Sequence, residues 1–267
     1  MSDIQRSSHP FRFRPQTNDE SVFQAVCANN EYRLPDTLDP KGLVIDIGAH
    51  IGSFCYAVLK RGAERVFGFE PDADNFNCAV ENLRGFGQRV HLSSKAIWRS
   101  DVADQALAIG RIDDNLGGWS MIWGLAEGVS IKEEVSVIGL DDAIRQITNG
   151  GRQRVQILKI DCEGAEFPIL FTSRTLHLVD GICGEFHELG GDYDPFGIPE
   201  RFKVPGVERF TIVELTNKLQ EAGFSVSSVR HDTTNMGLFF AARGVSTLSC
   251  LDRLKFIWRS WRANSQT

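Results

Sequence analysis

The sequence predicts an α/β fold with a mostly parallel sheet and helices on both of its faces. Apolar, strand-like runs alternate with helical patterns from residue 43 onward, which is typical of βαβ units. A glycine-containing turn, "DIGAHIGSF", follows the first of these runs, at the usual place for a ligand-binding turn in such sheets. The chain has 267 residues, of which 42% are hydrophobic and 24% charged, so one large domain with a substantial core is expected.

The expected parallel strands are "LVIDI" (43–47), "RVFGFE" (65–70), "VHLSSKAI" (90–97), "VQILKID" (155–161) and "GICGEFH" (181–187). Between the first three, the spacing of apolar residues predicts helices in "GSFCYAVLKRG" and "DADNFNCAVENLRGFG". Near the C-terminus, "FSVSSVRHDTTNMGLFFAAR" contains two strand-like runs with a polar turn between them. This predicts a closing antiparallel hairpin.

The chain ends and one inner segment depart from the alternation. Residues 1–16 are polar and basic, and we expect a flexible N-terminal tail there. One domain covers residues 17–245, beginning with a helix at 19–30 and carrying a β-rich insertion near 101–138. Residues 246–267 include "LDRLKFIWRSWR", which predicts a basic amphipathic C-terminal helix. That helix either docks on its own domain or contacts an anionic membrane surface.

Composition and charge exclude several classes of protein. The formal net charge of −6 argues against a nucleic-acid binder, because phosphate contacts need clustered Lys and Arg. The six cysteines form no C-x-x-C pair, so we expect reduced thiols rather than a disulfide framework. The sequence contains no signal peptide and no stretch near the roughly 18 apolar residues of a membrane-spanning helix. We therefore expect a cytoplasmic protein without a transmembrane segment.

The glycine turn does not match the known phosphate-binding loops. His50 stands where the dinucleotide motif G-x-G-x-x-G needs its second glycine, and no G-K-S/T follows as in a P-loop. Asp46, Gly48 and Gly52 remain, without a pyrophosphate site. This pattern favours a nucleoside without phosphates, whose amino-acid part lies along the loop.

A second acid supports a nucleoside ligand. "GFEPD" ends the second expected strand and places Glu70 twenty-four residues after Asp46. A carboxylate at this strand tip can accept hydrogen bonds from both ribose hydroxyls. Together the loop and Glu70 favour S-adenosylmethionine over NAD. The alternative is an ordinary βα turn followed by a surface glutamate.

Five segments in their order resemble the FkbM-type S-adenosylmethionine-dependent methyltransferases. They are "DIGAHIGSF", "GFEPDADNFNCAVENL", "SSKAIW", "VIGLDDAI" and "ILKIDCEGAEFPIL", within about residues 17–243. The resemblance implies a Rossmann-like, seven-stranded class I methyltransferase fold and S-adenosylmethionine as cofactor. It also implies methyl transfer to a hydroxyl oxygen of a sugar, a glycan or a small secondary metabolite.

Carried over by position, the resemblance also assigns a cofactor site. The expected residues are Asp46, Gly48, His50 and Gly52 at the methionine end, Glu70 and Pro71 at the ribose, Ser94 and Ala96 at the adenine, and Asp161 beside donor and acceptor. Two residues depart from the family's pattern: His50 replaces an expected Asn, and Cys162 stands where an aliphatic residue is more common. Neither departure removes a carboxylate.

Methyl transfer to a hydroxyl needs an aligned acceptor and a group that takes its proton. Lys159 and Asp161 point the same way from one expected strand, because side chains alternate along it. We expect Asp161 to be catalytic, and Lys159 to be either catalytic or a structural ion-pair partner. His187, at the end of the next strand, is our candidate general base, since histidine titrates near neutral pH. The alternative is a histidine that is only hydrogen-bonded there.

Asp161, Glu163, Glu185 and His187 could also hold a divalent metal. Their spacing forms no closed ligand motif, so we expect no metal.

The acceptor is the least constrained feature. We expect an O-methyltransferase acting on a small molecule or glycan, with no nucleic-acid partner. Transfer to a nitrogen or to a macromolecule is one alternative, although strand four ends in "DCEG" and not in an "NPPY"-type motif. A catalytically silent nucleoside-binding partner protein is another, and an NAD-dependent oxidoreductase is disfavoured by the missing glycines. The sequence does not define the acceptor or the oligomeric state.

Overall fold

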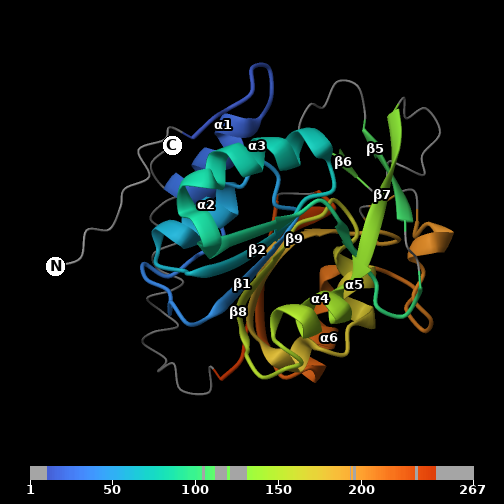
Figure 1. Cartoon of the computed structure of the whole chain (residues 1–267). Coiled ribbons are helices and arrows are strands. Elements are labelled where there is room, and N and C mark those ends of the chain that lie inside the picture. The colour runs from blue at the N-terminus through green and yellow to red at the C-terminus, as the bar shows by residue number, and fades with distance from the viewer. Residues whose placement is uncertain are drawn as a thin grey trace, which may run out of the picture.

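The computed structural model describes residues 11–103, 106–111, 119–120, 131–192, 194, 197–231 and 234–244. At its centre is a seven-stranded sheet in the order β10-β11-β9-β8-β1-β2-β3 (Figure 1). The strands are β1 Leu43–Ile47, β2 Arg65–Phe69, β3 Val90–Ser93, β8 Val155–Ile160, β9 Val179–His187, β10 Ser225–Arg230 and β11 Met236–Ala242. The first five are parallel, and β11 and β10 pair antiparallel at the edge beyond β9. This confirms the predicted fold class, including the C-terminal hairpin.

The chain reverses its direction of travel across the sheet at β1. It first moves outward from β1 to β2 and β3, and later returns to the other side of β1 to form β8 and β9. Loops that leave neighbouring strands at such a reversal diverge, and a crevice opens at the carboxyl ends of the strands. The topology therefore places a ligand site over β1 and β8.

The run at 90–97, which we predicted as one strand, is divided between two sheets. Its first half is β3, and its second half pairs with a later strand in a four-stranded sheet of order β4-β7-β5-β6. These strands are β4 Ala96–Trp98, β5 Ala106–Arg111, β6 Trp119–Ser120 and β7 Ile131–Gly139. They lie beside the large sheet, at the right of Figure 1. Buried Leu107, Ile109 and Val135 join them to the main core.

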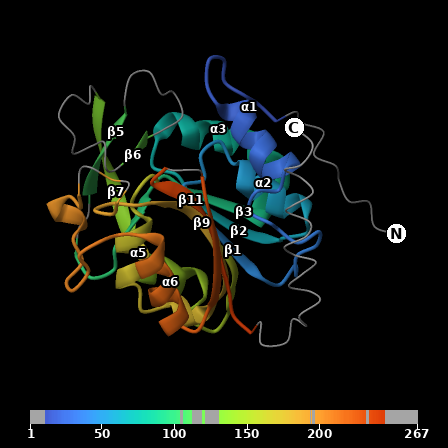
Figure 2. The same ribbon diagram turned by 180° about the vertical axis from the view of Figure 1, so that it is seen from behind.

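The helices cover both faces of the large sheet (Figures 1 and 2). They are α1 Asp19–Phe23, the π-helix η1 Gln24–Ala28, α2 Ser53–Lys60, α3 Ala73–Leu83, α4 Leu140–Ile147, α5 Glu166–Thr172 and α6 Ile212–Glu221, with short 3-10 helices η2 Arg84–Arg89, η4 Leu176–Leu178 and η5 Glu200–Phe202. α1 to α3 lie over one face and α4 to α6 over the other. β1 serves both layers, because its side chains alternate: Val44 packs with Val58 of α2, and Ile45 belongs to the cluster of Phe167 in α5.

The N-terminal segment packs against the α2 side of the domain. Residues 11–16, which we expected in a flexible tail, instead contact it: the ring of Phe11 lies 4.5 Å from that of Phe23 and 5.2 Å from that of Tyr56, centroid to centroid. The helix expected at 19–30 is present as α1 and η1. The segment thereby becomes part of the folded domain.

The expected C-terminal helix at 246–267 lies outside the described residues. Within the part of the chain that the structure describes, no helix has the length and apolar character needed to cross a membrane.

Candidate active site

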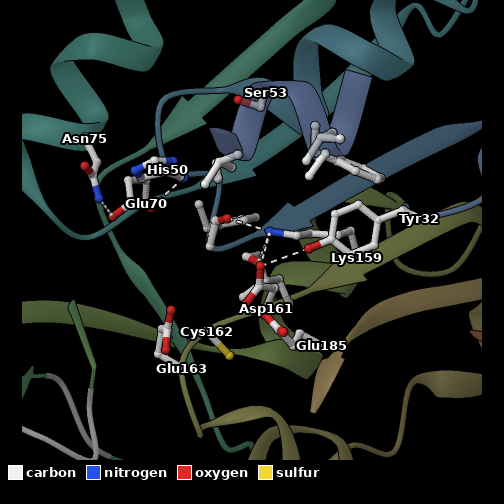
Figure 3. A pocket seen from close by; sticks show the side chains of 18 of the residues that line it. Tyr32, His50, Ser53, Glu70, Asn75, Lys159, Asp161, Cys162, Glu163 and Glu185 are labelled. Carbon is white, nitrogen blue, oxygen red and sulfur yellow. Dashed lines mark hydrogen bonds and ion pairs between the residues drawn. The ribbon is translucent and has the colours of Figure 1, made fainter. Parts of the chain in front are cut away.

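A cavity of about 470 Å³ opens at the carboxyl ends of β2, β1, β8 and β9, where the topology places its crevice. Its walls come from the loop after β1, the tip of β2, the start of α2, strand β4 and the ends of β8 and β9 (Figure 3). Val22, Val26 and Tyr32 of the N-terminal segment form a further wall. Small-molecule sites span about 300–1,000 Å³, so the cavity has the size of a ligand site.

Seven of the eleven predicted site residues line this cavity. They are Gly48, His50, Glu70, Pro71, Ala96, Lys159 and Asp161. The other four do not line it. Asp46 is fully buried, and Gly52, which precedes α2, faces Leu83 of α3. Ser94 is exposed, and His187 lies against two glutamates. Sequence spacing found the loop and the strand tips, but it did not separate side chains that face the cavity from side chains that support it.

Lys159 ties the two central strands together. Its Nζ lies 3.3 Å from Asp46 Oδ1 and 3.7 Å from Asp161 Oδ2, and it donates a hydrogen bond of 2.6 Å to the carbonyl oxygen of Gly48. Burial alone would lower the pKa of Lys159, but the charges of Asp46 and Asp161 raise it above its ordinary value. Lys159 is therefore a cation at neutral pH, and the geometry favours the structural ion pair over a catalytic base.

Gly48 allows the ends of β1 and β8 to meet closely. Its φ is +75°, and a Cβ at this position would collide with the carbonyl oxygen of Asp161. Only glycine combines that backbone conformation with that close approach.

Asp161 is held as a carboxylate at the end of β8. It accepts a 2.9 Å hydrogen bond from the hydroxyl of Tyr32, which lies in the N-terminal segment. Burial works to raise the pKa of Asp161, but the charges of Lys159 and His187 and the Tyr32 hydrogen bond hold it below its usual value. A cavity-facing carboxylate that stays ionised can accept a hydrogen bond from a hydroxyl of a bound molecule.

Glu70 organises the β2 side of the cavity. It is buried, and its two carboxyl oxygens accept the backbone N–H of His50 at 2.7 Å and that of Asp72 at 3.0 Å. Burial raises the pKa of Glu70 to about 7, against the opposing effect of those backbone hydrogen bonds. A carboxylate offers about four lone-pair sites, so Glu70 retains acceptors for a ligand in the cavity.

The loop after β1 is held in place by the N-terminal segment. Asp19, with no exposed surface, accepts hydrogen bonds from the backbone and the guanidinium of Arg14 at 2.8–2.9 Å. Its Oδ1 also lies 3.5 Å from Nε2 of His50, a residue with a φ of 50°. Burial lowers the pKa of His50 to about 4, so the ring is neutral at neutral pH.

His187, at the end of β9, lies between two glutamates. Its Nδ1 lies 3.3 Å from Glu166 Oε1 and its Nε2 lies 3.6 Å from Glu163 Oε2. Burial works to lower the pKa of His187, but the two glutamates raise it to about 10. An imidazolium has no free lone pair for a proton, so this charge state disfavours His187 as the general base and favours the alternative of a hydrogen-bonded histidine.

Several cavity residues were not singled out from the sequence. Tyr32 and Glu31 lie before the strand–helix alternation begins, so no motif marked them. Ser53 follows Gly52 at the start of α2; it lines the cavity, is 2% exposed, and its hydroxyl has no hydrogen-bond partner within the described residues. The described ranges contain no group of three or more His, Cys, Asp or Glu arranged to hold a metal ion.

The sequence matches one protein-family model, described as the methyltransferase FkbM domain, over residues 46–226. The match spans β1 to β10 and so includes every cavity wall except the N-terminal segment and Leu238. Among curated proteins, none matches the sequence.

Several solved structures are similar in fold. A putative RNA methyltransferase from Pyrococcus horikoshii is 14% identical, with 89% of each chain covered and a TM-score of 0.39. A putative S-adenosylmethionine-dependent methyltransferase from Listeria monocytogenes is 14% identical, with 80% of this chain and 96% of that chain covered and a TM-score of 0.42. TrmK from M. capricolum, in complex with S-adenosylhomocysteine, is 9% identical, with 81% and 67% covered and a TM-score of 0.41. At such identities and scores, the likeness says nothing about the acceptor.

The Lys159–Asp46 pair yields a stability prediction. Breaking a buried pair strands a charge and costs about 3–5 kcal/mol, so Lys159→Met should lower the free energy of unfolding by about that amount. Adding Asp46→Asn removes the stranded charge and should recover part of the loss. Urea unfolding followed by circular dichroism measures both variants. A single variant as stable as the wild type would show that the pair does not support the fold.

The charge state of His187 yields a pH prediction. Because its pKa in the folded protein is about 10 and its ordinary value is 6.5, the imidazolium stabilises the fold fully below pH 6.5. This contribution is lost as the pH rises through 10. The stability difference between the wild type and His187→Gln should therefore be larger at pH 6 than at pH 10.5. A His187 proton resonance that titrates near pH 6.5 in NMR spectra would contradict this charge state.

Proposed function

Because the chain belongs to the FkbM methyltransferase family and uses S-adenosylmethionine, we propose that it methylates a hydroxyl oxygen of a sugar, a glycan or another small metabolite. The observation that carries the proposal is the cavity at the topological switch point, with Glu70 at one end and Asp161 at the other. Glu70 suits the ribose of a nucleoside, and Asp161 suits the hydroxyl of an acceptor.

The cavity residues fit S-adenosylmethionine. Glu70 can accept hydrogen bonds from the ribose hydroxyls, and Ala96 and Ile97 offer apolar surface for the adenine. The backbone of Gly48 and His50 lines the part of the cavity where the amino-acid end of the cofactor would bind. The buried, unpartnered hydroxyl of Ser53 is a polar group that the protein itself leaves unsatisfied, as expected of a ligand contact. When bound, the cofactor supplies an electrophilic methyl group on a sulfonium.

The protein's part in the reaction is to position the acceptor and exclude water. Asp161 accepts the hydrogen bond of the acceptor hydroxyl and so orients its oxygen, while Lys159 and Tyr32 hold the carboxylate in one place. Val22, Val26 and Phe54 supply apolar wall that keeps water out of the cavity.

We also propose that the protein works in the cytoplasm. The described cysteines are all free: Cys27, Cys55, Cys78, Cys162 and Cys183. Free thiols persist in reducing compartments, where disulfides are rare.

Removal of the Glu70 carboxylate tests the cofactor site. Glu70→Ala removes the ribose acceptor and the partner of the His50 N–H, so affinity for S-adenosylhomocysteine should fall about 100-fold, equal to about 2.7 kcal/mol. Glu64→Ala is the matched control, because Glu64 is exposed just before β2 begins. Calorimetric titration of each purified protein gives the dissociation constants. Equal affinity in all three proteins would exclude Glu70 from the site.

The acceptor is tested by turnover. Methyl-labelled S-adenosylmethionine is offered with sugars, glycans and hydroxylated small metabolites, and label transferred to an ether oxygen is the expected product. Asp161→Asn should lower the rate about 100-fold, since a positioned carboxylate contributes on that scale. Its affinity for S-adenosylhomocysteine should change little. Label on nitrogen, or only on protein or RNA, would overturn the proposed acceptor class.

A further inference from the structure

The cavity is acidic where β8 and β9 end. Asp161 and Glu185 lie at the ends of these paired strands, and Glu163 and Glu31 line the same part of the cavity. Figure 3 shows three of them, Asp161, Glu163 and Glu185, below the Lys159 ammonium. Each of the four carboxyls interacts electrostatically with at least one other, so they form one charged group.

The buried cations at this end already have carboxylate partners. Lys159 lies 3.3 Å from Asp46, which faces away from the cavity, and His187 lies 3.3 Å from Glu166, which is also buried. Each cation is thus largely compensated by a carboxylate behind the cavity wall. On the cavity side, Asp161 lies 3.7 Å from Lys159 and Glu163 lies 3.6 Å from His187, so the two cations already face four carboxyls before Glu31 and Glu185 are counted.

Three other titratable groups around the glutamates, Tyr32, Cys162 and His50, are neutral at pH 7. Burial raises the pKa of the Tyr32 hydroxyl and of the Cys162 thiol, and it lowers that of His50 to about 4. His231 lies 3.7 Å from Glu185 but is 46% exposed. The glutamates therefore face little positive charge beyond the two paired cations.

Burial holds the three glutamates close to a half-ionised state. It raises the pKa of Glu31 and of Glu163 to about 7 and that of Glu185 to about 8, with the charge of Asp161 adding to the effect. A new positive charge in the cavity would favour the ionised forms and release protons.

The other groups in the cavity orient the cofactor toward this end. Glu70 and Ala96 lie on the β2 side, and the unpartnered Ser53 hydroxyl, 2% exposed, lies where α2 begins after the β1 loop. A cofactor whose ribose lies at Glu70 extends across β1 toward β8. Its sulfur then approaches the acidic end.

We propose that Glu31, Glu163 and Glu185 make this end of the cavity selective for a cation, so that the site prefers the sulfonium of the methyl donor over the neutral thioether of the product. The inference rests on the proposed function, because it assumes that the cofactor occupies this cavity. The methyl transfer needs no further reactant. Asp161, which accepts the hydrogen bond of the acceptor hydroxyl, takes its proton as the C–O bond forms, while the C–S bond breaks and leaves its electron pair on sulfur. The positive charge is then gone, and the glutamates no longer favour the bound product.

The test compares two ligands that differ at the sulfur. The wild-type protein is titrated calorimetrically with S-adenosylmethionine and with S-adenosylhomocysteine at pH 6 and pH 8, each in buffers of different ionisation heat. The affinity ratio of donor to product should rise about tenfold between the two pH values, since one pKa unit corresponds to a factor of ten. The donor should also release more protons than the product.

Variants separate the glutamates from the ligand's own titration. Glu31→Gln, Glu163→Gln and Glu185→Gln, together in one protein, should abolish the rise in the ratio and the excess proton release. The ligands' own amino groups titrate alike in both proteins, so they cannot cause this difference. Glu31→Gln alone changes no residue of the sheets and should reduce both effects. Exposed Glu64→Gln is the control and should behave like the wild type.

Two results would overturn the inference, and they are distinguishable. If both ligands bind but the ratio and proton release are the same in the triple variant as in the wild type, the charge selectivity is absent and the proposed function stands. If neither ligand binds the wild-type protein, the placement of the cofactor fails, and this inference fails with it.

Discussion

The ion pair between Lys159 and Asp46 is the interaction on which the site depends. It joins β8 to β1 at the point where the chain reverses across the sheet, and the same ammonium holds the carbonyl oxygen of Gly48 and stands beside Asp161. One buried cation thereby fixes the loop after β1 and helps to keep the cavity-facing carboxylate ionised. A sheet of this topology opens a crevice without such a pair. The pair gives that crevice a defined charge pattern.

That charge pattern has an inner and an outer layer. Behind the wall, Asp46 and Glu166 compensate Lys159 and His187. Facing the cavity are further carboxyls: Asp161 and Glu163 contact the same two cations, and Glu185 adds another carboxyl beside them. A buried charge that has a partner keeps its charge state. A partly buried carboxyl with a pKa near 7 changes its ionisation when a charged ligand binds. His187, the residue that looks most like a base in the sequence, lies between a glutamate of each layer, Glu166 and Glu163, and their charges raise its pKa.

Much of the fold followed from sequence periodicity, and less of the site did. The glycine loop, Glu70 and Asp161 were found because motifs at strand ends have fixed places in a parallel sheet. The run at 90–97 was misread as one strand, because no local signal shows that β4 leaves for another sheet. Tyr32 and Ser53 were missed because their roles depend on contacts with distant segments. The charge of His187 depends on Glu166, which lies 21 positions earlier in the chain, and no local pattern shows that the two side chains meet.

The hydrogen bond between Tyr32 and Asp161 joins residues 129 positions apart. A chain that emerges from the ribosome presents Tyr32 early, yet this part of the cavity wall has no partner until β8 has been made and paired with β1. Contacts of such long range form late, because the loop between them must be closed before they contribute. Binding competence should thus be among the last properties the nascent chain acquires, and the cofactor cannot assist the early steps of folding.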